Sequence, residues 1–380
     1  MLEGLPERVI RELSEGIGPR LGGSEGSHRA RDFLADLLAE LGLDVRLQRF
    51  AYVGWDYERP PSLEVRAPAS ETLACAPAAF SAASEGPVEG TVWADGKVVI
   101  IPGLFEMTRL AVGDGGERQA ALLVPPLPGP PYPLPLAQRT TPEPTVYVSK
   151  DDGDRIQAWL ERGREVSVRV ETFGRHVPGM VDWNVVGTLP GESDEVVVVS
   201  SHYDTAVNAP GAMDNASGVA AMAEVARRAK ERGVRRTHEF IAFAAEEWML
   251  VGSEHYVEEL VRSGAIDRYR GVVNCDPLGP GETLEVWVGP EELRGRVDRI
   301  LYELGVPDRH PIVYREPKTG SDHYPFWQRG VPACFPIFMP PPHEYHQPSD
   351  TVAIVDPSKL ATIVDIVDAV ARELDRQPLQ

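Results

Sequence analysis

Apolar residues near the start of the chain repeat with the period of a helix. Within residues 27–41 they recur at intervals of one, three or four, as Phe33, Leu34, Leu37, Leu38 and Leu41. This spacing places them on one stripe of a helix, and the following Gly42 is a typical helix stop. Residues 44–52 are then predicted to form a strand.

From residue 184 onward, short apolar runs alternate with amphipathic stretches. Residues 195–200 are a nearly continuous run of valine, which is typical of a strand buried on both faces. Further strands are predicted at 238–244, 271–275, 283–288 and 332–338, and helices at 217–232, 251–261, 291–304 and 357–374. This alternation predicts an α/β fold with a mixed, mostly parallel, doubly wound sheet flanked by helices.

The middle of the chain has a different pattern. Short β-like runs such as residues 120–125 are separated by Gly and Pro, and they are followed by a helix pattern at 152–162 and a strand pattern at 165–172. We therefore predict an inserted β-rich domain at 60–178. The α/β domain is then discontinuous and consists of residues 1–59 and 179–380.

Composition and charge restrict the expected partners. With 380 residues, 42% of them hydrophobic, the chain can bury a large core, and global disorder is not expected. The net charge is −20, and the longest basic runs are the pairs Arg227-Arg228 and Arg235-Arg236. A nucleic-acid backbone or an anionic membrane would be repelled, so neither is an expected partner.

Cysteine usage and the first residues bear on location. Three cysteines, an odd and sparse set, argue against a disulfide framework and fit a reducing compartment. Residues 1–11 carry charges without the apolar core of a signal peptide, and no apolar run approaches the ~20 residues that span a bilayer. We expect a cytoplasmic protein, and the sequence leaves open whether it forms a homo-oligomer.

Candidate metal ligands follow three of the predicted strands. His202 follows the run 196–201, Glu246 and Glu247 follow 239–245, and Asp276 follows 272–275. An acidic residue after one strand is routine. In an open α/β sheet, however, the carboxyl ends of the strands meet at the edge where ligands bind. The joint occurrence therefore predicts a site at that edge.

The carboxylates in these segments have structural interpretations as well as functional ones. Asp204 could orient the imidazole of His202, or form an Asx turn or a helix cap. Asp214 could bridge two cations, or cap the helix that follows it. Neighbours such as Glu246 and Glu247 point opposite ways in an extended chain, so one could bind a metal while the other faces substrate.

Taken together, the motifs of this chain resemble those of the two-zinc exopeptidase family. That family includes aminopeptidase Y, the bacterial leucyl aminopeptidases and glutamate carboxypeptidase II. Residues 7–52 are similar to its N-terminal helix and first strand, and the insertion resembles its protease-associated domain. The motifs occur in the family's order over about residues 180–355: residues 201–205 (Ser-His-Tyr-Asp-Thr), residues 211–218 (Gly-Ala-Met-Asp-Asn-Ala-Ser-Gly), Glu246-Glu247, residues 274–276 (Asn-Cys-Asp), residues 320–323 (Gly-Ser-Asp-His) and Tyr345-His346.

The resemblance assigns a role to each matching residue. It implies two divalent metal ions, with Zn2+ the expected metal, and a cis peptide bond after Asp214. One metal would be held by His202 and Asp276 and the other by Glu247 and His346, with Asp214 bridging them. Glu246 would be the general base, and Asp204 is counted with the catalytic residues. Asp322 and His323 match the motif without a defined role, and Trp248-Met249 departs from the family, so that Trp248 either narrows the pocket or packs in the core.

The resemblance implies a metallopeptidase catalytic domain, and we expect a zinc-dependent exopeptidase. It would hydrolyse peptide bonds with a metal-bridging water and Glu246 as the base. An aminopeptidase is favoured because an acidic site attracts a protonated amine. The alternatives are a carboxypeptidase or dipeptidase, for which Arg315, Lys318 or Arg329 could bind a carboxylate, a single-zinc enzyme like glutaminyl cyclase, and a non-catalytic binding protein. The preferred side chain and the role of the insertion stay open.

Overall fold

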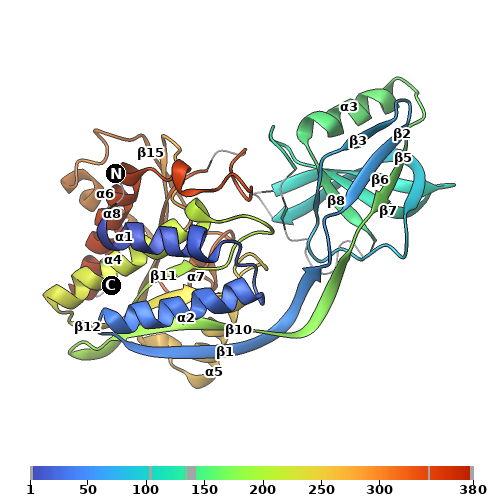
Figure 1. Ribbon diagram of the computed structural model, residues 1–380. Coiled ribbons are helices and arrows are strands. Elements are labelled where there is room, and N and C mark those ends of the chain that lie inside the picture. Colours follow the sequence, from blue (N-terminus) through green and yellow to red (C-terminus); the bar gives the residue numbers. More distant parts are fainter. Residues whose placement is uncertain (1–2, 102–104, 132, 135–142, 341–342, 377–380) are drawn as a thin grey trace. The chain divides into compact units, whose positions relative to one another are not determined.

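The computed structural model describes residues 3–101, 105–131, 133–134, 143–340 and 343–376. The chain forms two compact units. The first consists of Met1–Ala51 and Val181–Gln380, and the second of Tyr52–Met180. Each unit is built around its own sheet (Figure 1).

The first unit contains a sheet of eight strands, most of which follow the predicted apolar runs. Its spatial order is β1 (Asp44–Tyr57), β10 (Gly174–Leu189), β12 (Arg236–Phe243), β11 (Ser193–His202), β13 (Tyr269–Asn274), β16 (Ala333–Phe338), β14 (Leu284–Gly289) and β15 (Ile312–Arg315).

Strand direction in this sheet agrees with the predicted fold class. The four central strands β12, β11, β13 and β16 run parallel, as do β14 and β15. Antiparallel pairs flank the centre, with β10 beside β12 on one side and β14 beside β16 on the other. The prediction of a mixed, mostly parallel sheet is therefore confirmed.

Helices cover both faces of the sheet. The helices are α1 (Gly4–Arg11), α2 (Glu25–Glu40), α4 (Gly218–Arg232), α5 (Val251–Ser263), α6 (Glu291–Glu303), α7 (His323–Trp327) and α8 (Pro357–Arg376). Helices α4 and α8 contact β11, while α5 and α7 belong to an apolar core with Val196 and Val198 of the same strand (Figure 1). Val197 and Val199 are fully buried as well, so β11 is apolar on both faces, as its valine run predicts.

The second unit is β-rich with one helix. Its sheet has the order β3 (Glu71–Leu73), β2 (Ser62–Ala67), β9 (Ser167–Glu171), β5 (Val88–Ile101), β6 (Phe105–Asp114), β7 (Glu117–Val124), β8 (Thr145–Val148) and β4 (Cys75–Pro77). Helix α3 (Lys150–Glu161) contacts β5 and β7, and it does so closely: a Cβ atom on Gly153 would lie 2.2 Å from Val124 Cγ1. Leu63, Leu110, Leu122 and Ile156 belong to the core of this unit.

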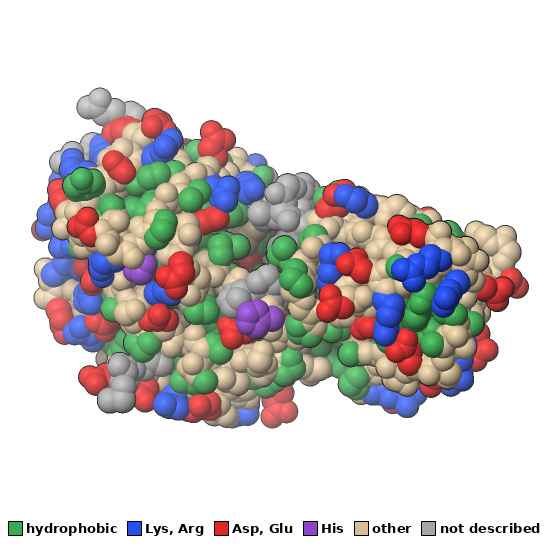
Figure 2. All heavy atoms as spheres, turned by 90° about the horizontal axis from the view of Figure 1, so that it is seen from above, with side chains coloured by type: hydrophobic (Ala, Val, Ile, Leu, Met, Phe, Trp, Pro, Cys, Tyr) green, Lys and Arg blue, Asp and Glu red, His purple; other side chains and the backbone are tan. Residues whose placement is uncertain are grey.

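On the face drawn in Figure 2, Lys and Arg side chains are scattered among Asp and Glu side chains. In the described part of the chain, no helix is both long enough and apolar enough to cross a membrane.

Candidate metal centre

The predicted site residues lie at the carboxyl ends of the central parallel strands. His202 is the last residue of β11, Glu246 and Glu247 lie just beyond the end of β12, and Asp276 lies just beyond β13. Two loops complete the set. Asp214 lies in the irregular helical segment η2 (Ala212–Ser217), which leads into α4, and His346 lies in the loop after β16.

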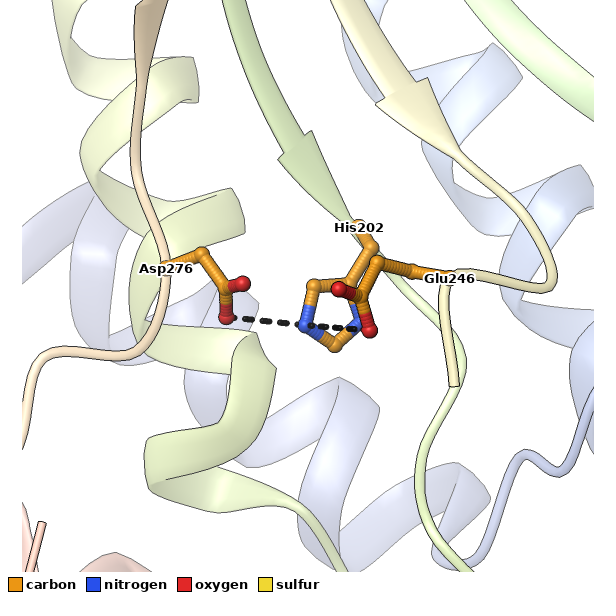
Figure 3. A group of neighbouring side chains, drawn as sticks. All are labelled: His202, Glu246 and Asp276. Atoms are coloured by element: carbon orange, nitrogen blue, oxygen red, sulfur yellow. Dashed lines mark hydrogen bonds and ion pairs between the residues drawn. The ribbon is translucent and has the colours of Figure 1, made fainter. Parts of the chain in front are cut away.

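Histidine and carboxylate atoms form two groups that share Asp214. In the first group, His202 Nε2 lies 2.9 Å from Asp276 Oδ1 and 3.9 Å from Glu246 Oε2 (Figure 3). In the second, His346 Nε2 lies 3.2 Å from Glu247 Oε2. One oxygen of Asp214 lies 3.2 Å from His202 Nε2, and its other oxygen lies 3.4 Å from His346 Nε2.

Burial shapes the protonation of these groups. It raises the pKa of Glu246 well above its ordinary value and that of Glu247 to about 8. Burial would also raise the pKa of Asp214, but hydrogen bonds with His202 and His346 outweigh it and hold that pKa far below its usual range. For His202, burial works toward a lower pKa, yet the charges of Asp276 and Glu246 raise it. Several buried carboxylates thus compete for few protons.

The donor set fits a pair of zinc ions. The five predicted ligands are at most 6% exposed, and they offer imidazole nitrogen and carboxylate oxygen, which zinc binds in proteins. Among the described residues, the buried Glu247 Oε1 has no hydrogen-bond partner. An unpaired buried carboxylate oxygen is unfavourable unless a cation or donor satisfies it. The residues present therefore suit a bound cation at each group.

The side chain of Asp204 contacts both His202, at the end of β11, and the acidic pair Glu246-Glu247. Its Oδ1 accepts a hydrogen bond from the backbone N–H of Glu246 at 3.1 Å, and its Oδ2 accepts one from Glu247 at 3.2 Å. Oδ1 also lies 3.5 Å from His202 Nδ1. These partners differ from those of an Asx turn or a helix cap. The side chain therefore connects the loop after β11 with the segment after β12. Ala245, just before the acidic pair, has a left-handed backbone with φ 56°.

Hydrogen bonds hold the backbone on both sides of Asp214. The Asp214–Asn215 bond is cis, as the resemblance predicts. The carboxylate of Asp350 accepts hydrogen bonds from the N–H groups of Met213 and Asp214 at 2.7 and 3.0 Å. Asn215, rather than Asp214, accepts the hydrogen bond from the N–H of Gly218 at the start of α4. A helix cap therefore does not account for Asp214.

Asp276 is oriented by a chain of hydrogen bonds through uncharged side chains. Ser321 Oγ donates to Asp276 Oδ2 at 2.5 Å, and Asn274 Nδ2 donates to Ser321 Oγ at 2.6 Å. Ser200 Oγ in turn donates to Asn274 Oδ1 at 2.7 Å. This chain leaves Asp276 Oδ1 facing His202, and partners of this kind fix the orientation of a metal ligand.

The remaining motif residues are buried beside these groups. Burial raises the pKa of Asp322 to about 7 and lowers that of His323 to about 3. His323 packs edge-on against Trp287, with ring centroids 6.0 Å apart. Trp248 is 3% exposed, and its indole N–H donates to the carbonyl of Gly22 at 3.3 Å. Of the two interpretations of Trp248, the geometry favours packing in the core.

Three residues that support the site were not predicted from the sequence: Ser321, Asp350 and Arg20. Ser321 lies inside the matched motif at 320–323, so its position was visible although its role was not. Asp350 comes four residues after His346 and carried no comparable signal. Arg20 is a fully buried cation that lies far from the matched motifs in the sequence.

Comparison with known proteins finds a family of peptidases to which this chain is similar. Residues 184–371 match the family model of Peptidase family M28. The chain is 26% identical over 406 residues to Aminopeptidase YwaD of Bacillus subtilis (strain 168), covering 96% of this chain and 83% of that protein. It is 25% identical over 246 residues to Carboxypeptidase Q of Mus musculus, covering 61% of this chain and 50% of that protein.

The fold is also found in a solved structure. The crystal structure of BSAP, a zinc aminopeptidase from Bacillus subtilis, superposes with a TM-score of 0.77 at 22% identity, covering 99% of this chain and 96% of that one. This likeness concerns the fold. Together with the family match, the comparisons confirm the predicted two-zinc exopeptidase family and a zinc-dependent metallo-exopeptidase.

Proposed function

We propose that the protein is an aminopeptidase whose five ligands hold two zinc ions. His202 and Asp276 would bind one ion, Glu247 and His346 the other, and Asp214 both. The observation that carries this proposal is the position of Asp214, whose two oxygens each approach a different histidine. When bound, the two ions would polarise the scissile carbonyl and make water acidic at neutral pH.

Glu246 is the proposed general base. Its side chain is 12% exposed, more than those of the five proposed ligands, so it can meet a substrate while Glu247 points into the second group. Burial raises its pKa, so it can hold a proton taken from the attacking water and return it to the leaving amine. Asp204 acts through the backbone, since it fixes the N–H groups of both glutamates.

Charge at the site supports a substrate with a free amine. Beside the two histidines, the site holds the carboxylates of Asp214, Glu246, Glu247 and Asp276, which attract a protonated N-terminus. A carboxypeptidase would need a free cation for the substrate carboxylate. Arg315 is held by Glu285 at 2.5 and 2.7 Å, and Lys318 lies over the Trp287 ring at 5.3 Å. The similarity to Aminopeptidase YwaD over 96% of the chain supports the same choice.

The test pairs substrates that differ in the amine alone. A panel of aminoacyl-p-nitroanilides is compared with the N-acetylated forms, using protein whose zinc content is measured by elemental mass spectrometry. We expect two zinc ions per chain and turnover of the free amines, with little turnover of the acetylated forms. Equal turnover of both forms, or cleavage at the carboxyl end of a peptide, would contradict an aminopeptidase. One tightly held zinc would instead favour the chemistry of a glutaminyl cyclase.

The second unit is proposed to be the inserted protease-associated-like domain, which its separate β-rich sheet and core support. A cytoplasmic location is checked by cell fractionation. Self-association is checked by light scattering over a range of protein concentrations.

A further inference from the structure

Arg20 is a fully buried cation, and its guanidinium donates to backbone carbonyl oxygens. Nε donates to Tyr203 O at 2.7 Å, Nη1 to Pro210 O at 2.7 Å, and Nη2 to Gly211 O at 3.0 Å. Nη1 also lies 2.7 Å from Leu13 O and 2.9 Å from Gly18 O. The guanidinium therefore connects the segment before α2 with both ends of the loop 203–211.

The loop that Arg20 holds separates two of the proposed ligands. Tyr203 directly follows His202, and Gly211 comes three residues before Asp214. The backbone N–H of Arg20 donates to Thr205 Oγ1 at 2.9 Å within the same loop. Gly211 has a left-handed backbone, and a Cβ atom there would lie 3.0 Å from Arg20 Nη2 and 2.3 Å from Thr205 Cγ2. This close fit sets the spacing of the loop.

The charge of Arg20 matters as much as its hydrogen bonds. Burial lowers the pKa of its guanidinium to about 10, so it stays protonated at neutral pH. The negative charges that act on it include Asp350, Asp204, Asp214 and Glu247. Burying a cation is expensive unless hydrogen bonds and nearby negative charges compensate, and Arg20 has both. Because Arg20 lies beside the acidic centre, its positive charge offsets the negative charges there.

We propose that Arg20 is a positioning residue of the metal centre. Its fork fixes the distance between His202 and Asp214, and its charge offsets the repulsion among the carboxylates when zinc is absent. This inference rests on the proposed function, since it concerns the same two-zinc site. The same segment has further anchors, because Gly22 O accepts from Trp248 Nε1 and the N–H of Gly23 donates to Asp182 Oδ2.

The experiment measures zinc binding to metal-free protein by competition with a chromophoric chelator. Arg20→Lys keeps the charge and removes the planar fork. Arg236→Lys is the matched control, because Arg236 is also buried, and it donates to Glu195 Oε2 and to Leu374 O at 2.6 Å near the other end of the strands. We expect Arg20→Lys to weaken zinc binding by roughly 10–100-fold, the range found when a group that orients a metal ligand is lost, because Arg20 holds the backbone next to His202 and close to Asp214. Arg236→Lys should leave zinc binding unchanged.

A second readout separates positioning from folding. Thermal unfolding of the metal-free variants shows how far each destabilises the chain, and the absorption spectrum of cobalt-loaded protein reports the ligand geometry. We expect a changed cobalt spectrum in Arg20→Lys and an unchanged one in Arg236→Lys. If Arg20→Lys does not fold, Thr205→Val decides, since it removes an acceptor of the same residue and should weaken zinc binding in the same direction by a smaller factor.

The two proposals fail in different ways. Wild-type protein that binds no zinc would overturn the two-zinc function and this inference with it. Wild-type protein that binds two zinc ions, together with an Arg20→Lys variant of equal affinity and spectrum, would overturn the role of Arg20 alone. Equal losses in Arg20→Lys and Arg236→Lys would also overturn it, because the effect would then follow general destabilisation.

Discussion

The two ends of the central strands differ in how their charged side chains are arranged. Near the start of β11, Glu195 accepts hydrogen bonds from Arg236 at 2.6 Å and Arg270 at 2.7 Å, and these bonds lower its pKa. At the end of the same strand, His202 lies among carboxylates whose pKa values burial raises. Opposite charges are paired within the chain at one end, whereas an excess of carboxylates is gathered at the other. The first arrangement suits stability, and the second suits a cation.

The largest expected effect tests the catalytic end. Glu246→Gln keeps the shape of the side chain and removes the base, so turnover should fall by roughly 10²–10⁴-fold. Zinc content should stay at the wild-type value, because Glu246 is not assigned as a ligand. Steady-state kinetics and elemental mass spectrometry check the two statements. Near-wild-type turnover would contradict the assignment of the base, and loss of one zinc would make Glu246 a ligand.

Removing the shared ligand should affect both metals. Asp214→Ala deletes the side chain whose oxygens face His202 and His346. We expect zinc affinity to fall by more than the ~100-fold typical of an outer partner, and activity to fall with it. Chelator competition measures the affinity. A fully metallated Asp214→Ala protein would show that Asp214 does not bridge.

A neutral partner of a ligand should matter less. Ser321→Ala removes the donor to Asp276 Oδ2, so the carboxylate loses its fixed orientation. We expect zinc affinity to decrease by roughly 10–100-fold. The control is Ser358→Ala, since Ser358 bonds locally to Asp356 near the start of α8. An unchanged affinity in Ser321→Ala would show that Asp276 is held by its other contacts.

A buried carboxyl group on the flanking strand β10 should make the free energy of unfolding depend on pH. Asp182, which accepts from Gly23 N–H and Ser27 Oγ, is buried, and burial raises its pKa to about 6. The folded state therefore keeps a proton that the unfolded state has lost, and the contribution of Asp182 to stability declines as pH rises from about 4 to 6. Asp182→Asn should remove a change in the free energy of unfolding on the order of 2 kcal/mol over that window. Urea unfolding at several pH values measures it, and an unchanged slope would contradict the raised pKa.

The smallest effect is expected at the paired end. Glu195 is half-buried and bonds with Arg236 and Arg270, and its lowered pKa contributes stability above pH ~4.5 that is lost as pH falls. Glu195→Gln should reduce the free energy of unfolding by about 0.2–1 kcal/mol at neutral pH. Zinc affinity should not change. A loss of zinc in this variant would show that the two ends are coupled.

Patterns within a short segment were sufficient for much of the fold and for the grouping of the ligands. The valine run predicted β11, and the polar residues after β11, β12 and β13 predicted the edge at which they meet. The helices that were missed are short: α1 has 8 residues and α7 has 5, too few to establish a period. Strand β15, with 4 residues at the sheet edge, gave equally little signal.

The contacts that orient the ligands could not be predicted in the same way. The hydrogen bond from Arg20 N–H to Thr205 joins residues 185 positions apart, and the bond from Ser321 to Asp276 spans 45. No periodic pattern links such residues, because the fold alone brings them together. The family resemblance supplied the ligand set and placed Ser321 and Asp322 in a matched motif, but it gave neither of them a role.

The division of the first unit into Met1–Ala51 and Val181–Gln380 has a consequence for synthesis. Translation proceeds from the N-terminus at ~5–20 residues per second, and a domain completes its fold once all of its segments have emerged. The segment that contains Arg20 is made early, yet its partners in the loop 203–211 follow only after the whole of residues 52–180. The second unit can therefore fold while α1 and α2 still lack their final packing surface. A newly made chain acquires its metal centre late, when its first and last segments meet.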